Sequence, residues 1–164
     1  MPQLIKNRAL CSNEWVLAGT EAAAAAKCLL LPLADYLKAM AAGEPAASRA
    51  VLLKPEDQDL APLLPHLPNL PLIAINFGST GEGRGYTQAR LLRERHGYKG
   101  ELRAVGAVRT DQVYFLARVG FDAFDLVDGD DAQVAIAQLD RFTVAYQTSV
   151  GTQTHTRMRY GHQG

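Results

Sequence analysis

The chain has 164 residues, and its contents of 48% hydrophobic and 21% charged residues are ordinary for a globular protein. Seventeen basic residues balance 17 acidic ones, so the overall charge gives no argument for binding nucleic acid. The longest apolar region, residues 22–37, is interrupted by polar residues and a proline, and it is shorter than the about 20 apolar residues of a membrane span. We therefore expect one cytoplasmic domain, residues 1–164, without a nucleic-acid or membrane partner.

Short apolar runs of strand length recur along the chain, at residues 14–18, 49–53, 70–77, 101–105 and 121–127. Between and after them lie segments with helical propensity or spacing, at residues 22–26, 32–40, 56–64, 86–96, 109–119 and 130–146. The first 45 residues have the weakest pattern, and the polar tail 147–164 is expected to fray. Strands that alternate with helices predict right-handed βαβ crossovers and a parallel sheet.

This alternation predicts an α/β fold with four to five βα units and leaves two architectures open. One is an open, doubly wound sheet with helices on both faces. The other is half-barrel-like, because four or five strands do not close the usual eight-stranded barrel. A half-barrel would need a second copy or a partner to cover its inner face, so a homo-oligomer is one arrangement to expect.

The stretch NFGSTGEGRGYTQAR follows the clearest predicted strand and carries Gly81, Gly83, Arg84 and Gly85. A glycine-rich turn from a strand to a helix can point backbone N–H groups at an anion, and an arginine there suits phosphate, sulfate or carboxylate. The nucleotide motifs fail, because Tyr86 stands where a dinucleotide fingerprint needs glycine and Arg84-Gly85 replaces the Lys-Ser/Thr of a P-loop. The alternative is a turn that needs glycine only for its backbone conformation.

A second loop, one βα unit later, carries Arg109, Asp111 and Gln112 and should open on the same edge of the sheet. These residues supply a cation, a carboxylate and an amide near a helix start. The alternative is that Asp111 or Thr110 caps the helix. Together the two loops predict one site for a small anionic ligand.

Other polar residues give weaker indications. The histidines and the aspartates of residues 122–131 match no metal-ligand spacing, so no metal ion is expected. Arg90, Arg93 and Arg95 share a predicted helix with Glu94, and the i,i+4 pair of Arg90 and Glu94 indicates a solvated face.

The run GRGYTQARLLRER at residues 83–95, followed by GYKGELRAVG at residues 97–106, resembles a bacterial family, domain-of-unknown-function family 934. Asp111-Gln112 and the run GFDAF at residues 120–124 resemble it too, and weaker matches extend from residue 30 to residue 147. Members are often described as probable oxidoreductases involved in sulfite reduction, encoded beside sulfite reductase.

The resemblance implies a partner such as sulfite reductase or another sulfur-assimilation protein. It implies no catalytic residue. Gly83 and Ala107 stand where relatives usually carry acids, so any role of those acids in proton transfer or metal binding is in question here.

The first hypothesis is thus an accessory or oxidoreductase-type protein of assimilatory sulfite reduction, in which Arg84 and Arg109 neutralise an anion and Glu82 or Asp111 handles protons. The alternatives are a non-catalytic binding or assembly partner of sulfite reductase, or a small α/β enzyme that acts on a phosphorylated metabolite. The cofactor is unknown, because the residues contain no flavin, nicotinamide or iron–sulfur signature. Electron transfer would need a bound cofactor or a partner.

Overall fold

The computed structural model describes residues 3–78 and 83–141 of the chain. Within these residues eight strands form one sheet in the order β2-β1-β8-β7-β6-β5-β4-β3. Strands β3 to β8 are parallel and lie in sequence order, whereas β1 runs antiparallel to both β2 and β8. The strands are β1 Gln3–Lys6, β2 Ala9–Cys11, β3 Trp15–Leu17, β4 Cys28–Pro32, β5 Arg49–Leu53, β6 Leu72–Phe77, β7 Glu101–Val108 and β8 Ala123–Leu126.

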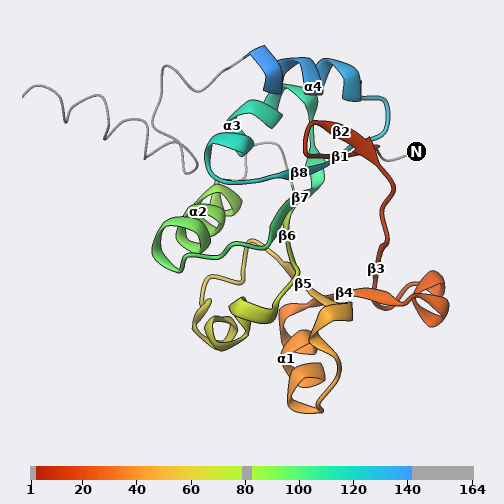
Figure 1. Cartoon of the computed structure of the whole chain (residues 1–164), viewed down its shortest axis with the longest axis vertical. Helices are drawn as coiled ribbons and strands as arrows, with labels where there is room; N and C mark the ends of the chain where they lie inside the picture. Colours follow the sequence, from red (N-terminus) through yellow and green to blue (C-terminus); the bar gives the residue numbers. More distant parts are fainter. Residues whose placement is uncertain (1–2, 79–82, 142–164) are drawn as a thin grey trace, which may run out of the picture.

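The sheet curls into a half-barrel, and the helices lie along its outer side (Figure 1). Each of β4 to β8 is followed by a helical segment, as the expected four to five βα units require. The helical segments are η1 Glu21–Ala25, α1 Leu33–Ala41, η2 Ala46–Ser48, η3 Ala61–Asn69, α2 Arg84–Arg90, the π-helical η4 Leu91–Arg95, η5 Thr110–Gln112, α3 Val113–Arg118 and α4 Ala132–Arg141. The sequential strand order with helices on one side confirms the half-barrel, and the doubly wound alternative is wrong.

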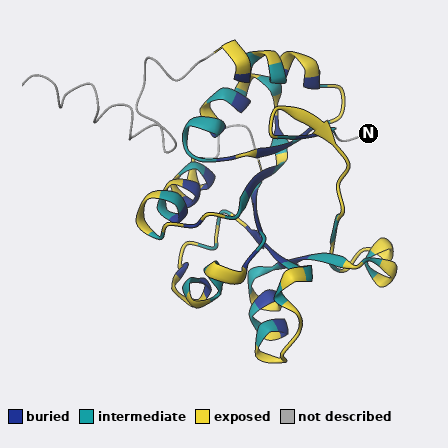
Figure 2. Cartoon of the chain, viewed as in Figure 1, coloured by how far each residue is buried: buried dark blue, intermediate teal, exposed yellow. Residues whose placement is uncertain are grey.

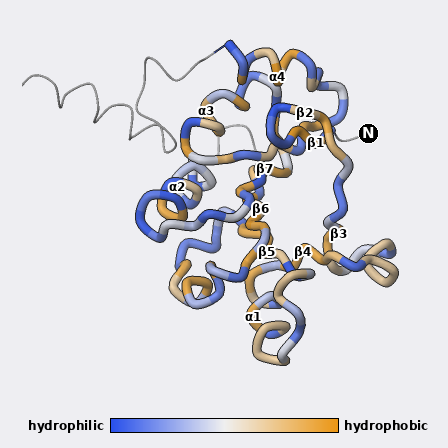
Figure 3. Tube along the Cα trace, in the orientation of Figure 1, coloured by the Kyte–Doolittle hydropathy of each residue, from blue (hydrophilic) through white to orange (hydrophobic). Residues whose placement is uncertain are grey.

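Alternate residues of the central strands face the two sides of the sheet. On the outer side, Val51 and Ile73 belong to the large core packed against the helices. On the inner, concave side, Leu30, Leu52 and Leu72 form a smaller cluster with Ala50 and Ala74. Buried and apolar residues follow these central strands (Figures 2 and 3). Burial on both faces explains why these strands appear in the sequence as continuous apolar runs.

Part of the inner face carries a buried network of charges. Arg103 Nη2 lies 2.7 Å from the Glu101 carboxylate, whose other oxygen lies 2.6 Å from Lys6 Nζ. Arg103 Nη1 also donates a 2.8 Å hydrogen bond to Asn13 Oδ1. Asn13 lies in the connection from β2 to β3, which crosses the open side of the half-barrel (Figure 1). The chain therefore covers part of its own inner face.

The helix predicted at residues 56–64 is wrong, and the aspartates there explain why. The Lys54 N–H donates to Asp57 Oδ2 and the Ala61 N–H donates to Asp59 Oδ1, so side chains satisfy backbone donors that a helix would use. A 3-10 helix, η3, begins only at Ala61 and runs to Asn69, with two prolines inside it. Among the described residues, no helix is long and apolar enough to cross a membrane.

Candidate functional site

The two predicted loops leave the carboxyl ends of neighbouring parallel strands, β6 and β7. Gly83 precedes α2, and Arg84 is the first residue of that helix. Arg109, Asp111 and Gln112 follow β7 directly. The structure therefore puts both loops on one edge of the sheet, which we call the carboxyl edge. Gly81 and Glu82 lie outside the described residues.

The glycines of the first loop have different roles. A Cβ atom at Gly85 would lie 2.6 Å from two atoms of the Phe77 ring, so only glycine lets the start of α2 pack on β6. Phe77 also packs edge-on against Tyr86, with ring centroids 5.4 Å apart. Gly83 is exposed, and a Cβ there would meet nothing within 4 Å. A side chain at position 83 would therefore leave the backbone without a clash at its Cβ atom.

Strand β7 is irregular where it approaches the carboxyl edge. Its pairing with β8 shifts register between Ala104 and Val108. Gly106 has φ of +92°, and a Cβ there would lie 2.4 Å from Asn76 Oδ1 at the end of β6. Such irregularities re-aim side chains and occur often beside active sites. Ala107 is half-buried within this irregular stretch.

Asp130, from the loop after β8, clamps the loop after β7. Its Oδ2 accepts a 2.6 Å hydrogen bond from the Thr110 N–H, and its Oδ1 lies 3.1 Å from Arg109 Nη2. The Asp130 side chain is only 10% exposed, whereas that of Arg109 is 56% exposed. Asp130 and Asp131 both precede α4, and the sequence alone does not distinguish which of them caps that helix. Asp131 is the cap, accepting from the Gln133 and Val134 N–H groups.

Gln112 closes the turn that begins at Arg109. Its side-chain Oε1 accepts from the Arg109 N–H at 3.0 Å, and its own N–H donates to the Arg109 carbonyl at 3.0 Å. The alternative expectation, capping by Asp111 or Thr110, is wrong for this turn, because Asp130 and Gln112 satisfy its backbone donors. Asp111 stays exposed. Burial and the charge of Asp111 both raise the pKa of the Tyr86 phenol, so Tyr86 and Asp111 share one neighbourhood.

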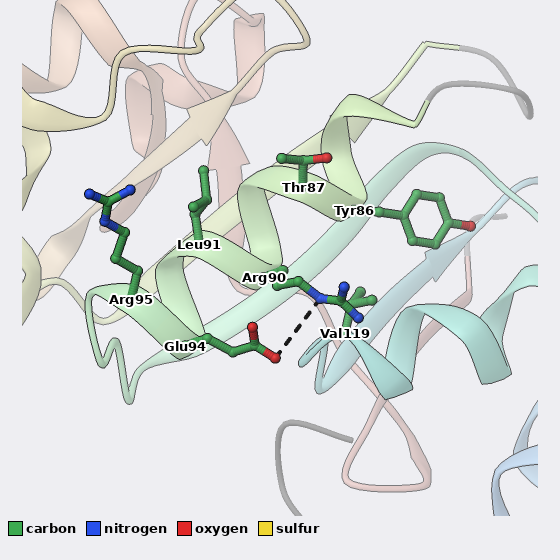
Figure 4. Close-up of a pocket in the computed structure, with 7 residues that line it drawn as sticks. All are labelled: Tyr86, Thr87, Arg90, Leu91, Glu94, Arg95 and Val119. Atoms are coloured by element: carbon green, nitrogen blue, oxygen red, sulfur yellow. Dashed lines mark ion pairs between the residues drawn. The ribbon is translucent and has the colours of Figure 1, made fainter. Parts of the chain in front are cut away.

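A groove adjoins the carboxyl edge on the outer side of the half-barrel. It runs between the α2–η4 helix and α3, in two connected parts of about 430 and 350 Å³ that share Tyr86, Arg90 and Val119. Figure 4 shows the larger part, with the Tyr86 ring at one end and Arg95 at the other. Arg90 Nε lies 3.9 Å from Glu94, as the i,i+4 spacing predicted. No local pattern in the sequence predicts this groove, because its two walls come from separate βα units.

Arg93, which lies between Arg90 and Arg95 in the sequence, has a different role. Arg93 was expected on a solvated face, but its side chain is 12% exposed and points into the fold. It donates to the carbonyls of Gly120, Tyr98 and Gly100 over 2.7–3.0 Å. Burial raises the pKa of the Tyr98 phenol well above its ordinary range, and that hydroxyl donates to the Leu70 carbonyl at 2.9 Å. This part of the family-like signature therefore holds the fold together.

Gln88 of the same signature is also structural. It is 4% exposed, and its Nε2 donates to the carbonyls of Lys54 and Asp57 over 2.9 and 2.8 Å. These bonds attach α2 to the loop after β5. Within residues 3–78 and 83–141, no three His, Cys, Asp or Glu side chains gather closely enough to hold a metal ion.

The comparisons with known proteins agree with the resemblance. A family model described as "Bacterial protein of unknown function (DUF934)" matches residues 50–157, from β5 to beyond α4. No curated protein matches the chain. Because the family model covers well over half of its residues, the chain belongs to DUF934, a family of bacterial proteins of unknown function.

Proposed function

We propose that the protein is an accessory protein of assimilatory sulfite reduction that binds a small oxyanion at the carboxyl edge. One observation carries the binding part of the proposal. The two loops of the family signature leave neighbouring strands, and each carries an arginine: Arg84 stands where the first loop enters α2, and Arg109 begins the second loop. The link to sulfite reduction rests on the family resemblance.

The ion pair and the exposure of Arg109 support an anion site of low affinity. Among the described residues, the only carboxylate on its guanidinium is Asp130, which contacts Nη2, and more than half of the side chain is exposed. A guanidinium has five N–H donors, so its outer side can still bind an oxyanion. Asp130 offsets part of the positive charge, and this lowers the attraction for the anion. Arg84, which is exposed at the start of α2, would supply the second cation.

Tyr86 and Asp111 would select the protonation state of the anion. The raised pKa of Tyr86 keeps its phenol protonated, so the hydroxyl is a donor at neutral pH. The Asp111 carboxylate can only accept, and it would bind an oxyanion that carries a proton. Sulfite and phosphate are partly protonated near neutral pH and sulfate is not. The site should therefore prefer sulfite or phosphate to sulfate.

Thermal unfolding tests the site directly. A ligand that binds only the folded state raises the unfolding midpoint, Tm. We expect sodium sulfite and sodium phosphate to raise the Tm more than sodium sulfate or chloride at equal ionic strength. The extra rise should be lost in Arg84→Ala and Arg109→Ala and kept in Arg141→Ala, an exposed arginine at the end of α4. Equal Tm shifts in the wild type and the three variants would overturn the proposed anion site.

Genetics tests the pathway separately. Deletion of the gene should impair growth on sulfate as the sole sulfur source and leave growth on cysteine normal. The wild-type gene should restore growth and the Arg84→Ala gene should restore it less. Normal growth of the deletion strain on sulfate would remove the sulfite-reduction role, whatever the result for anion binding.

A further inference from the structure

The groove between the α2–η4 helix and α3 has an apolar centre. Phe115 is 54% exposed, one of the few large hydrophobic side chains in the described residues that the fold leaves open. Tyr86 and Val119 line both parts of the groove, and Leu91 lines the larger part. An aromatic side chain exposed in a groove, with apolar neighbours, is typical of a surface that binds another molecule.

The rim of the groove is basic. Arg90, Arg95 and Arg118 line it, against one acid, Glu94. The pair of Arg90 and Glu94 is long, at 3.9 Å, and both side chains are exposed, so it binds the Arg90 guanidinium only weakly. Arg118 Nε is buried and has no hydrogen-bond partner among the described residues, although the guanidinium lies 5.8 Å from the Tyr114 ring centroid. Arg118 therefore has unused hydrogen-bonding capacity beside the groove.

The shape favours a chain segment over a compact ligand. Tyr86, Arg90 and Glu94 recur every four residues along one wall, and Phe115 and Val119 have the same spacing on the other. The groove thus follows the axis of the α2–η4 helix, whose Tyr86, Arg90 and Glu94 line it in turn (Figure 4). Small-molecule sites usually enclose most of the ligand surface, whereas grooves between helices accept amphipathic segments.

We propose that this groove binds an acidic segment of a partner protein that carries an apolar anchor residue. The anchor would pack on Phe115 and Val119. Carboxylates of the segment would pair with Arg90 and Arg118, which both line the smaller part of the groove. This surface shares Tyr86 with the carboxyl edge but contains neither Arg84 nor Arg109, so the proposal does not depend on anion binding there.

A random peptide library displayed on phage is the probe. Selection against the full chain should enrich peptides that combine several acidic residues with an aromatic or aliphatic one. A synthetic peptide from that pool, followed by fluorescence anisotropy, should bind Phe115→Ala about tenfold more weakly or worse, as expected for an interface anchor. The double variant Arg90→Glu/Arg118→Glu should lose binding further. Lys27→Glu, a charge reversal at a single exposed residue before β4, should bind like the wild type.

Several outcomes would overturn the proposal. They are the absence of any enriched peptide, enriched peptides without acidic residues, and equal binding by wild type and Phe115→Ala. Displacement of the peptide by sodium phosphate, but not by sodium chloride of equal ionic strength, would assign the groove to a small anion. A dimer in sedimentation that Phe115→Ala dissolves would assign it to a second copy of this chain. If Arg90→Glu/Arg118→Glu has a lower Tm than the wild type, Phe115→Ser is used as the test variant in its place. Phe115 is exposed, so its side chain can be changed without loss of the core.

Discussion

Arg93 and Gly120 fit one another across two βα units. The Arg93 Nε donates to the Gly120 carbonyl at 3.0 Å, and a Cβ atom at position 120 would lie 2.5 Å from Arg93 Cγ. Gly120 also has φ of +114°, a backbone conformation that side chains disfavour. Arg93 thereby joins the end of α3 to the helix before it, while two further carbonyls hold it to the loop before β7.

Loss of this arginine should destabilise the fold. Arg93→Ala removes the arginine donor from three carbonyls and the paired cation from Asp122, and we expect a loss of about 2–4 kcal/mol in the free energy of unfolding. Urea unfolding, followed by the fluorescence of Trp15, measures it. Arg95→Ala is the control, since Arg95 is exposed on the same helix, and it should change the free energy by less than about 0.5 kcal/mol. Equal effects of the two substitutions would contradict the role of Arg93.

Two glycines of the family signature give a matched pair. Gly85→Ala pushes a methyl group into the ring of Phe77, which is itself buried, and should cost about 1–3 kcal/mol. Gly83→Ala meets nothing and has φ of −79°, so it should be within about 0.5 kcal/mol of the wild type. The same urea experiment compares them. A neutral Gly85→Ala would show that Phe77 can move aside.

The clamp between Asp130 and Arg109 limits anion binding, and Asp130→Asn tests this. The amide oxygen can still accept from the Thr110 N–H, but the negative charge beside Arg109 is gone. We therefore expect a larger rise of Tm in sodium sulfite or phosphate than the wild type shows. Asp130→Ala is the control for loss of the hydrogen bond, and its Tm should be lower without any ligand. An unchanged anion response in Asp130→Asn would place Arg109 outside the site.

Asp125 should make stability depend on pH. Burial on the inner face raises the pKa of its carboxyl above the ordinary value, and the Arg103 guanidinium offsets only part of this. A raised pKa means that the folded state holds its proton more tightly than the unfolded chain. The stabilisation is therefore complete below the unfolded pKa of about 4 and is lost as pH rises through the folded pKa.

Asp125→Asn removes the buried charge, so it should raise the Tm at pH 7. The difference from the wild type should shrink as pH falls toward 4 and below. Thermal unfolding at a series of pH values measures it, with the exposed Asp140→Asn as control. A variant less stable than the wild type at neutral pH would mean that the attraction to Arg103 outweighs burial.

Most of the parallel sheet could be predicted from the sequence. Strand β5 has the predicted bounds, residues 49–53. Val51 and Leu52 are buried on opposite faces of the sheet, so this strand appears in the sequence as an unbroken apolar run. Strands β1, β2 and β4 were missed. The short N-terminal hairpin forms only because β1 pairs with β8, and β2 is exposed throughout. A tertiary contact of this kind leaves no local pattern.

The candidate site was predicted in part. The spacing of the two loops predicted that Arg84 and Arg109 would lie on one edge, because parallel strands end together. Asp130 was missed as a site residue, since its partner lies on another βα unit and its carboxylate resembled a helix cap. The inward direction of Arg93 was missed as well. The π-helical η4 changes which side chains face the sheet, and a regular helical count does not predict it.

The position of β1 between β2 and β8 has a consequence for folding during synthesis. Ile5 is made well before its partner across the strands, Phe124. Until β8 has left the ribosome, the buried side chains of Leu4 and Ile5 have no sheet to join. Each parallel strand can add to the one before it, but the hairpin must wait for the last. Contacts so distant in sequence form slowly, so docking of the N-terminal hairpin should be the late step that completes this half-barrel.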